Sequence, residues 1–145
     1  MRIFLAILVL GLAACGVREE YPKVSASGVD TLGSINLQPE DGSCIWIFSL
    51  RTESADQTPV FGFSGRTGYL AINGERQHLA LEKASDNMVM GVSHQQSFRS
   101  DELVATLVLR EATDAPARTL DGVLSLTKPS GWSTVLPLRG TEICR

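Results

Sequence analysis

The stretch YLAINGERQHLAL, residues 69–81, decides the fold class because it holds the strongest β-hairpin signal of the chain. Asn73-Gly74 separates two short runs rich in strand-forming residues, at 69–72 and 75–81. An Asn-Gly pair supplies the positive φ angles that a two-residue hairpin turn requires. We therefore predict two antiparallel strands joined by a tight turn.

Strand signals continue on both sides of this hairpin. Residues 44–48, CIWIF, form a continuous aromatic and β-branched run, typical of a central strand that is covered on both faces. Pro137 indicates that the last strand lies at a sheet edge or bends there. Residues 80–87 could form at most one helical turn. The remaining strands are expected at 60–63, 88–92, 102–110, 122–127 and 132–138, with a Pro- and Gly-containing turn at 128–131.

This spacing predicts an all-β domain over residues 33–145. About seven to eight antiparallel strands in this length are typical of a sandwich or a small barrel, and the pattern leaves both open. The length suits one domain with its own core.

The N-terminus has the layout of an export signal. Arg2 precedes an apolar run at 3–10, small residues continue to Cys15, and charge returns at 18–20. A transmembrane helix needs roughly 20 apolar residues, so this run is too short to be one. We expect residues 1–14 to be a cleaved signal peptide and 15–32 to be a flexible tether.

Leu12-Ala13-Ala14-Cys15 resembles the lipobox of bacterial lipoproteins. The resemblance implies cleavage before Cys15 and a diacylglycerol on its thiol, so that membrane lipid is the first partner. Several acyl chains together anchor a protein firmly, at about 0.8 kcal/mol for each buried CH₂. Gly16, where inner-membrane lipoproteins often carry Asp, implies the outer membrane, with the domain facing the periplasm. The alternative, an ordinary buried Cys15, leaves the apolar run unexplained.

Lipidation of Cys15 leaves two cysteines, Cys44 and Cys144. Exported proteins meet an oxidising compartment, in which two remaining thiols usually pair. We predict a Cys44–Cys144 disulfide, with two separate buried thiols as the alternative.

The charge balance disfavours nucleic acid as a partner. The whole chain has 13 basic and 16 acidic residues, a net charge of −3, and loss of Arg2 with the signal makes it −4. The basic residues are scattered, whereas nucleic-acid binding needs clustered positive charge.

Candidate catalytic groups are few, so we expect no enzyme, no metal and no cofactor. His78 and His94 have no third ligand at metal-binding spacing. The GFSGR run at 62–66 has Arg66 where a nucleophile elbow needs glycine. The matches to SxxK at 125–128 and SDN at 85–87 stand in the reverse of the order that serine β-lactamases require.

Two resemblances concern the mature domain. Cys44 with Trp46, the Ala71–Gly74 hairpin and the Gly140-to-Cys144 end are similar to a group of small proteobacterial envelope proteins of unknown function. The paired cysteines and the run 64–69, SGRTGY, resemble membrane-bound inhibitors of C-type lysozyme, whose Ser-Gly-x-x-Tyr loop is one residue shorter.

The second resemblance implies that Ser64 and Tyr69 bind carboxylates of a cationic enzyme. The alternative places Tyr69 in a strand, packed beside Ile72 and Leu79.

The sequence therefore predicts a lipid-anchored cell-envelope protein that is a non-catalytic binding or structural module, with a periplasmic protein as one candidate partner. An inhibitor of a cationic cell-wall hydrolase and a small envelope enzyme are the alternatives. A binding module should expose an aromatic or apolar patch, with Trp46, Trp132 or Tyr69 as candidates, whereas an enzyme should have a deep pocket with converging polar groups.

Overall fold

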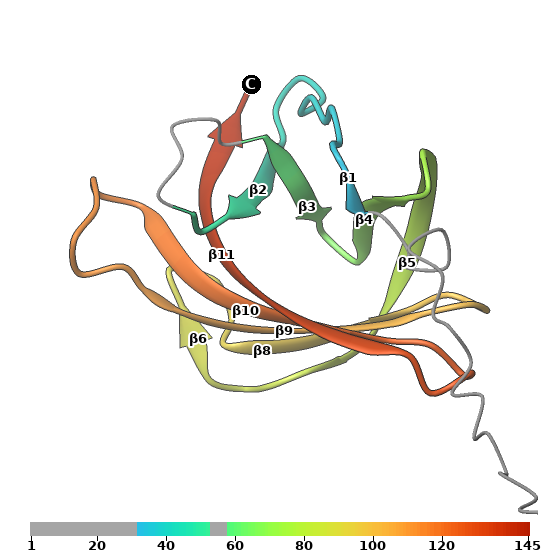
Figure 1. Cartoon of the computed structure of the whole chain (residues 1–145). Helices are drawn as coiled ribbons and strands as arrows, with labels where there is room; N and C mark the ends of the chain where they lie inside the picture. Colours follow the sequence, from blue (N-terminus) through green and yellow to red (C-terminus); the bar gives the residue numbers. More distant parts are fainter. Residues whose placement is uncertain (1–31, 53–57) are drawn as a thin grey trace, which may run out of the picture.

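The computed structural model describes residues 32–52 and 58–145, and all the regular structure in these ranges is β (Figure 1). The strands are β1 (Leu32–Gly33), β2 (Cys44–Leu50), β3 (Pro59–Ser64), β4 (Thr67–Ile72), β5 (Glu75–Ala84), β6 (Met88–Val89), β7 (Val92–Ser93), β8 (Gln95–Arg99), β9 (Val104–Glu111), β10 (Thr119–Thr127) and β11 (Ser133–Cys144).

Eight of these strands close into an antiparallel barrel. β2, β3, β4, β5, β8, β9, β10 and β11 each pair with the next in chain order, and β11 returns to pair with β2. β1 adds two residues beside the end of β4, while β6 and β7 form a separate small hairpin. Of the two architectures that the strand pattern allowed, the protein adopts the barrel.

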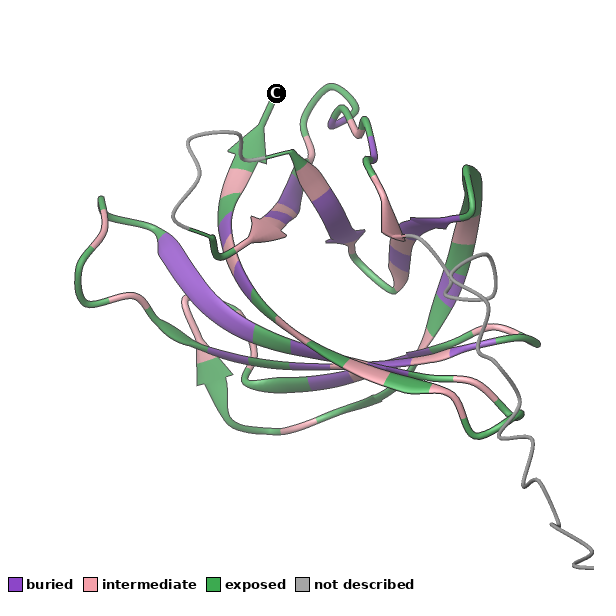
Figure 2. Cartoon of the chain, in the orientation of Figure 1, coloured by how far each residue is buried: buried purple, intermediate pink, exposed green. Residues whose placement is uncertain are grey.

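The barrel interior is a packed core. Buried residues lie on every strand of the barrel (Figure 2), as expected where the residues of a strand face inward and outward in turn. Aromatic rings from β2, β3 and β8 meet inside it, with Phe48 6.0 Å from Phe63 and Phe61 5.8 Å from Phe98 between ring centroids. Gly140, directly opposite Phe48 on β11, makes room for that ring, because a Cβ there would lie 2.3 Å from a ring carbon.

The predicted hairpin at Asn73-Gly74 is confirmed. Asn73 has φ 52° and Gly74 has φ 80°, and Ile72 pairs directly with Glu75 across the turn. The suggested helical turn at 80–87 is wrong, because β5 continues as a strand to Ala84.

The single strand expected at 88–92 is also wrong. Met90 and Gly91 both have positive φ, 49° and 83°, so the chain reverses there and makes the β6–β7 hairpin. No strand was expected at β8, whose inward residues are Gln96 and Phe98. A glutamine on the inner face hides the apolar alternation that marks a strand.

The strand at 44–48 is central and covered on both faces, as predicted. β2 lies between β3 and β11, its outer residue Ile45 is buried, and the segment before it runs over the outside of the barrel. A Cβ on Gly62 of the neighbouring strand would meet the side chains of Leu37 and Ile35, which shows how closely this segment packs.

Pro137 occupies a local edge of β11. Within the described ranges, β11 pairs with β2 only from Leu138 onward, so Pro137 has a strand neighbour on one side, in β10. The Pro137 carbonyl accepts a 2.9 Å hydrogen bond from the Arg51 amide, just past the end of β2. The missing N–H of proline therefore breaks no ladder bond.

The predicted disulfide is present. Cys44 and Cys144 are register partners at the ends of β2 and β11, and their sulfurs are bonded across 100 residues of chain. The bond lies where the first strand of the barrel meets the last.

Candidate functional site

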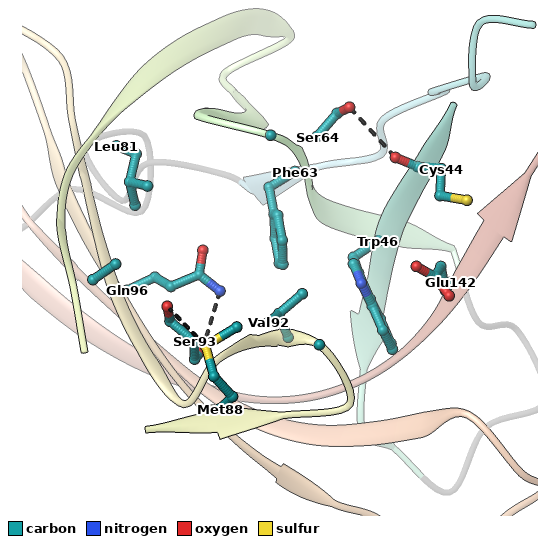
Figure 3. Close-up of a pocket in the computed structure, with 13 residues that line it drawn as sticks. Cys44, Trp46, Phe63, Ser64, Leu81, Met88, Val92, Ser93, Gln96 and Glu142 are labelled. Atoms are coloured by element: carbon teal, nitrogen blue, oxygen red, sulfur yellow. Dashed lines mark hydrogen bonds between the residues drawn. The ribbon is translucent and has the colours of Figure 1, made fainter. Parts of the chain in front are cut away.

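One end of the barrel is hollowed. We call this hollow, of about 310 Å³, the mouth; Trp46, Phe63, Leu81, Val92, Gln96 and Glu142 contribute to its walls (Figure 3). The disulfide lies at its rim, and the β6–β7 hairpin borders it. Below the mouth the interior is filled by fully buried side chains such as Phe48, Phe98 and Leu107.

Three side chains form a row along one wall. Phe63 of β3 pairs with Trp46 of β2, which pairs in turn with Glu142 of β11. Residues directly opposite in an antiparallel sheet point to the same face, so all three side chains are directed toward the barrel interior near its open end. Trp46 and Phe63 are only 3% and 4% exposed.

Gln96 comes from the opposite wall. β8 is four strands away from β2 in either direction around the ring of eight. Gln96 is 4% exposed, and its Nε2 donates a 3.2 Å hydrogen bond to the carbonyl of Ser93. Its Oε1 turns into the mouth (Figure 3) and has no hydrogen-bond donor within the described part of the chain. Gln96 therefore presents an acceptor to whatever enters.

The Trp46 indole contributes a donor. In the described ranges no acceptor contacts its N–H, and Figure 3 shows the ring lining the mouth with Phe63 beside it. Its other ring neighbour is Phe48, stacked at 6.2 Å between centroids.

Glu142 is the one charged residue among those that line the mouth in the described chain. Its carboxylate forms an ion pair with the guanidinium of Arg118, from the loop before β10. Arg118 has φ 59°, a left-handed conformation that costs a non-glycine residue about 1 kcal/mol or more. The charge of Glu142 is thus already countered from outside the mouth.

Ser64 and Tyr69 both lie on the outer side of the β3–β4 hairpin. The Ser64 hydroxyl, at the rim of the mouth, donates a 3.5 Å hydrogen bond to the carbonyl of Cys44. The Tyr69 ring packs edge-on against His78, its register partner, at 5.2 Å. The expected packing of Tyr69 beside Ile72 and Leu79 is wrong. Those two side chains point into the barrel, whereas Tyr69 points outward.

The lipidation candidate Cys15 lies outside the described residues. Within those residues, no helix has the length and apolarity needed to cross a membrane. Cys44, Glu142 and Cys144 are the one group of three metal-type ligands found there, and the disulfide occupies both sulfurs.

A charged cluster on the outer face joins four elements, and nothing in the sequence predicted it. Asp121 of β10 is buried under Arg139 and Arg51, with its carboxylate oxygens 2.8 Å and 3.3 Å from their nitrogens. Arg139 also holds Asp114, at 2.6 Å, and the hydrogen bond to Arg139 lowers the pKa of Asp114 below its ordinary value. The pKa of Arg139 is raised, mainly by its hydrogen bond to Asp121 and next by its hydrogen bond to Asp114.

A smaller hollow, of about 180 Å³, lies at the other end of the barrel. Leu32, Ile72 and Trp132 contribute to its walls, and the Lys128 ammonium lies 5.8 Å from the Trp132 ring centre. The described chain enters the fold here, because Leu32 pairs with Ile72 beside the Asn73-Gly74 turn.

No family model, curated protein or solved structure matches this chain.

Proposed function

We propose that this protein is a lipid-anchored module of the cell envelope that binds a ligand, without catalysis, in the mouth of its barrel. The observation that carries the proposal is the contrast along the barrel axis. The interior is packed along most of its length, but at one end two aromatic rings and a buried glutamine face an open hollow. A hollow that combines aromatic rings with a few placed polar groups is a candidate site for a small molecule.

The anchor proposal rests on the N-terminal sequence. The lipobox-like LAAC at 12–15 supports acylation of Cys15, and Gly16 supports the outer membrane with the domain in the periplasm. The described chain begins at Leu32, at the end of the barrel opposite the mouth. A tether attached there would let the mouth face away from the lipid and toward ligands or partner proteins in the periplasm.

The chemistry of the mouth favours binding over catalysis. Glutamine does not transfer protons, Glu142 is engaged by Arg118, and the Ser64 hydroxyl is bonded to a backbone carbonyl. General acid–base catalysis needs a titratable group free to transfer a proton, and nucleophilic catalysis needs a nucleophile within reach of a base. Among the described lining residues Glu142 is paired with Arg118 and no nucleophile–base pair is formed, which supports a binding module.

Intact-protein mass spectrometry of the native membrane fraction tests the anchor. We expect loss of residues 1–14, added acyl chains and a disulfide that reduction opens. A Cys15→Ala variant should lack the acyl mass and leave the membrane fraction. An unlipidated native protein would overturn the anchor proposal.

Equilibrium dialysis of the neutral single-ring ketone acetophenone against a detergent blank tests the mouth. Val92→Trp should fill the mouth and abolish specific binding of the ketone, because Val92 lines it. Val135→Trp, on an outer position that is 63% exposed, is the matched control and should bind as the wild type does. Equal binding by both variants would place the binding site elsewhere.

Inhibition of a cationic cell-wall hydrolase is the second candidate function. It draws support from the shared outer face of Ser64 and Tyr69 and from the net negative charge. If the protein inhibits a C-type lysozyme, and if this inhibition is lost in Tyr69→Ala but kept in Val92→Trp, the function is hydrolase inhibition through the outer face and not ligand binding in the mouth. If the wild-type protein does not inhibit the lysozyme, this second candidate function is excluded.

A further inference from the structure

We infer that the mouth selects an uncharged, ring-sized ligand that carries a hydrogen-bond acceptor on one side and a donor on the opposite side. This inference rests on the proposed function and names the class of ligand. It follows from where the polar groups of the mouth lie and from which of them are already used.

The two polar groups that are unused within the described chain lie on opposite walls. Trp46 is on β2 and Gln96 is on β8, halfway around the ring of eight strands. Trp46 offers an N–H and Gln96 offers Oε1, whose orientation follows from the bond of Nε2 to Ser93. A ligand between them therefore meets a donor on one wall and an acceptor on the other.

Both polar groups are held in place. Gln96 is buried and tied through its amide nitrogen, and Trp46 is buried and packed on Phe48. A fixed polar group in an apolar wall discriminates strongly, because a ligand that lacks the complementary atom leaves it unpaired.

Apolar side chains cover part of the space between the two walls. Phe63 lies beside Trp46 as its register partner, and Leu81 and Val92 also line the hollow (Figure 3). A volume of about 310 Å³ is at the small end of ligand pockets and suits a single ring with short substituents. Aromatic walls favour a flat apolar body.

Charge selects against ions. No lysine or arginine is among the described residues that line the mouth, so an anion would lose its hydration without gaining a counter-charge. A cation would have to compete with Arg118 for the carboxylate of Glu142. An uncharged ligand meets neither cost.

Three probes with one benzene ring test the inference in the full-length protein: 4-hydroxyacetophenone, which has a donor and an acceptor on opposite sides, acetophenone, which lacks the donor, and benzylammonium. Equilibrium dialysis against a detergent blank gives affinities at a pH that keeps the phenol uncharged. The two tryptophan indole N–H signals in ¹⁵N–¹H spectra locate the site. Trp132 lies at the other end of the barrel, so the signal that disappears in Trp132→Phe is assigned to Trp132 and the remaining signal to Trp46.

We expect 4-hydroxyacetophenone to shift the Trp46 indole signal and to bind about five- to tenfold more tightly than acetophenone, the worth of one hydrogen bond. Gln96→Leu should remove this advantage, because the variant has no acceptor to bond the hydroxyl of 4-hydroxyacetophenone or to stay unpaired beside acetophenone. Trp46→Phe should weaken both ketones, and Trp132→Phe neither.

The other outcomes separate the two proposals. If both ketones bind the wild type equally and Gln96→Leu changes neither, the ligand class is wrong and the mouth remains the binding site. Tighter binding of benzylammonium, lost in Glu142→Gln, would assign the mouth to organic cations and overturn the inference alone. If no probe shifts the Trp46 signal or binds saturably, the inference and the mouth as binding site both fail.

Discussion

Cys44 and Cys144 are register partners in the first and last strands of the barrel, and their disulfide joins the two strands at the mouth. Seven residue pairs connect β2 to β11, from Leu50 opposite Leu138 to the two cysteines. Closure of the barrel thus depends on a ladder between segments that lie at opposite ends of the domain sequence.

Replacement of both cysteines by alanine should lower the free energy of unfolding by about 2–4 kcal/mol, because the unfolded chain regains the freedom that the cross-link removes. Urea unfolding of the wild type and the double variant measures this difference. Far-UV circular dichroism should stay unchanged, since the ladder remains. Coincident unfolding midpoints would show that the bond adds no stability to the closed barrel.

Gly140→Ala should destabilise the fold by about 1–3 kcal/mol or more, because the new Cβ would lie within 2.7 Å of the Ile47 carbonyl oxygen as well as against Phe48. Gly33→Ala is the matched control, since its Cβ would meet Ala71 at an ordinary 3.4 Å. Thermal unfolding compares the two variants. A larger loss in Gly33→Ala would contradict the close contact of Gly140 with Phe48 and Ile47.

Asp114→Asn should make stability less dependent on acidic pH. Arg139 holds the pKa of Asp114 below its ordinary value of 3.8, so the unfolded chain takes up this proton at a higher pH than the folded protein does. The stabilisation is therefore complete above the ordinary pKa and is lost as the pH falls through the folded pKa.

Urea unfolding at a series of pH values should show a constant difference between wild type and Asp114→Asn down to about pH 5, and a narrowing difference below about pH 4. High salt should reduce the difference at every pH, because the pair is near the surface. A difference that widens with acid would reverse the assigned direction.

Asp121→Asn should cost about 1–3 kcal/mol, because it weakens charge-assisted hydrogen bonds at a side chain that is only 7% exposed. Glu82→Gln is the control, since its 3.0 Å pair with Arg99 is exposed and should contribute less than about 1 kcal/mol. Chemical unfolding of both variants in one buffer makes the comparison. Equal losses in the free energy of unfolding would mean that the burial of Asp121 does not strengthen its interactions.

The sequence by itself determined the local structure. Asn73-Gly74 specifies its own turn, because the φ angles that it favours are a property of two residues. The aromatic run that became β2 marked a central strand, since only a strand covered on both faces can be apolar throughout. The disulfide was predicted from the two cysteines that remain when Cys15 is set aside as the lipidation site.

Only the tertiary structure decided between sandwich and barrel and assembled the mouth. Residue alternation tells which side chains share a face, but it does not tell which face turns inward or which strands become neighbours. Gln96 is an example: within the run QQSFR it resembles a surface residue. Only closure of the barrel places it on the inner face, across from Trp46. Likewise, Asp121 meets Arg51 and Arg139 only because strands far apart in the chain come together in the barrel wall.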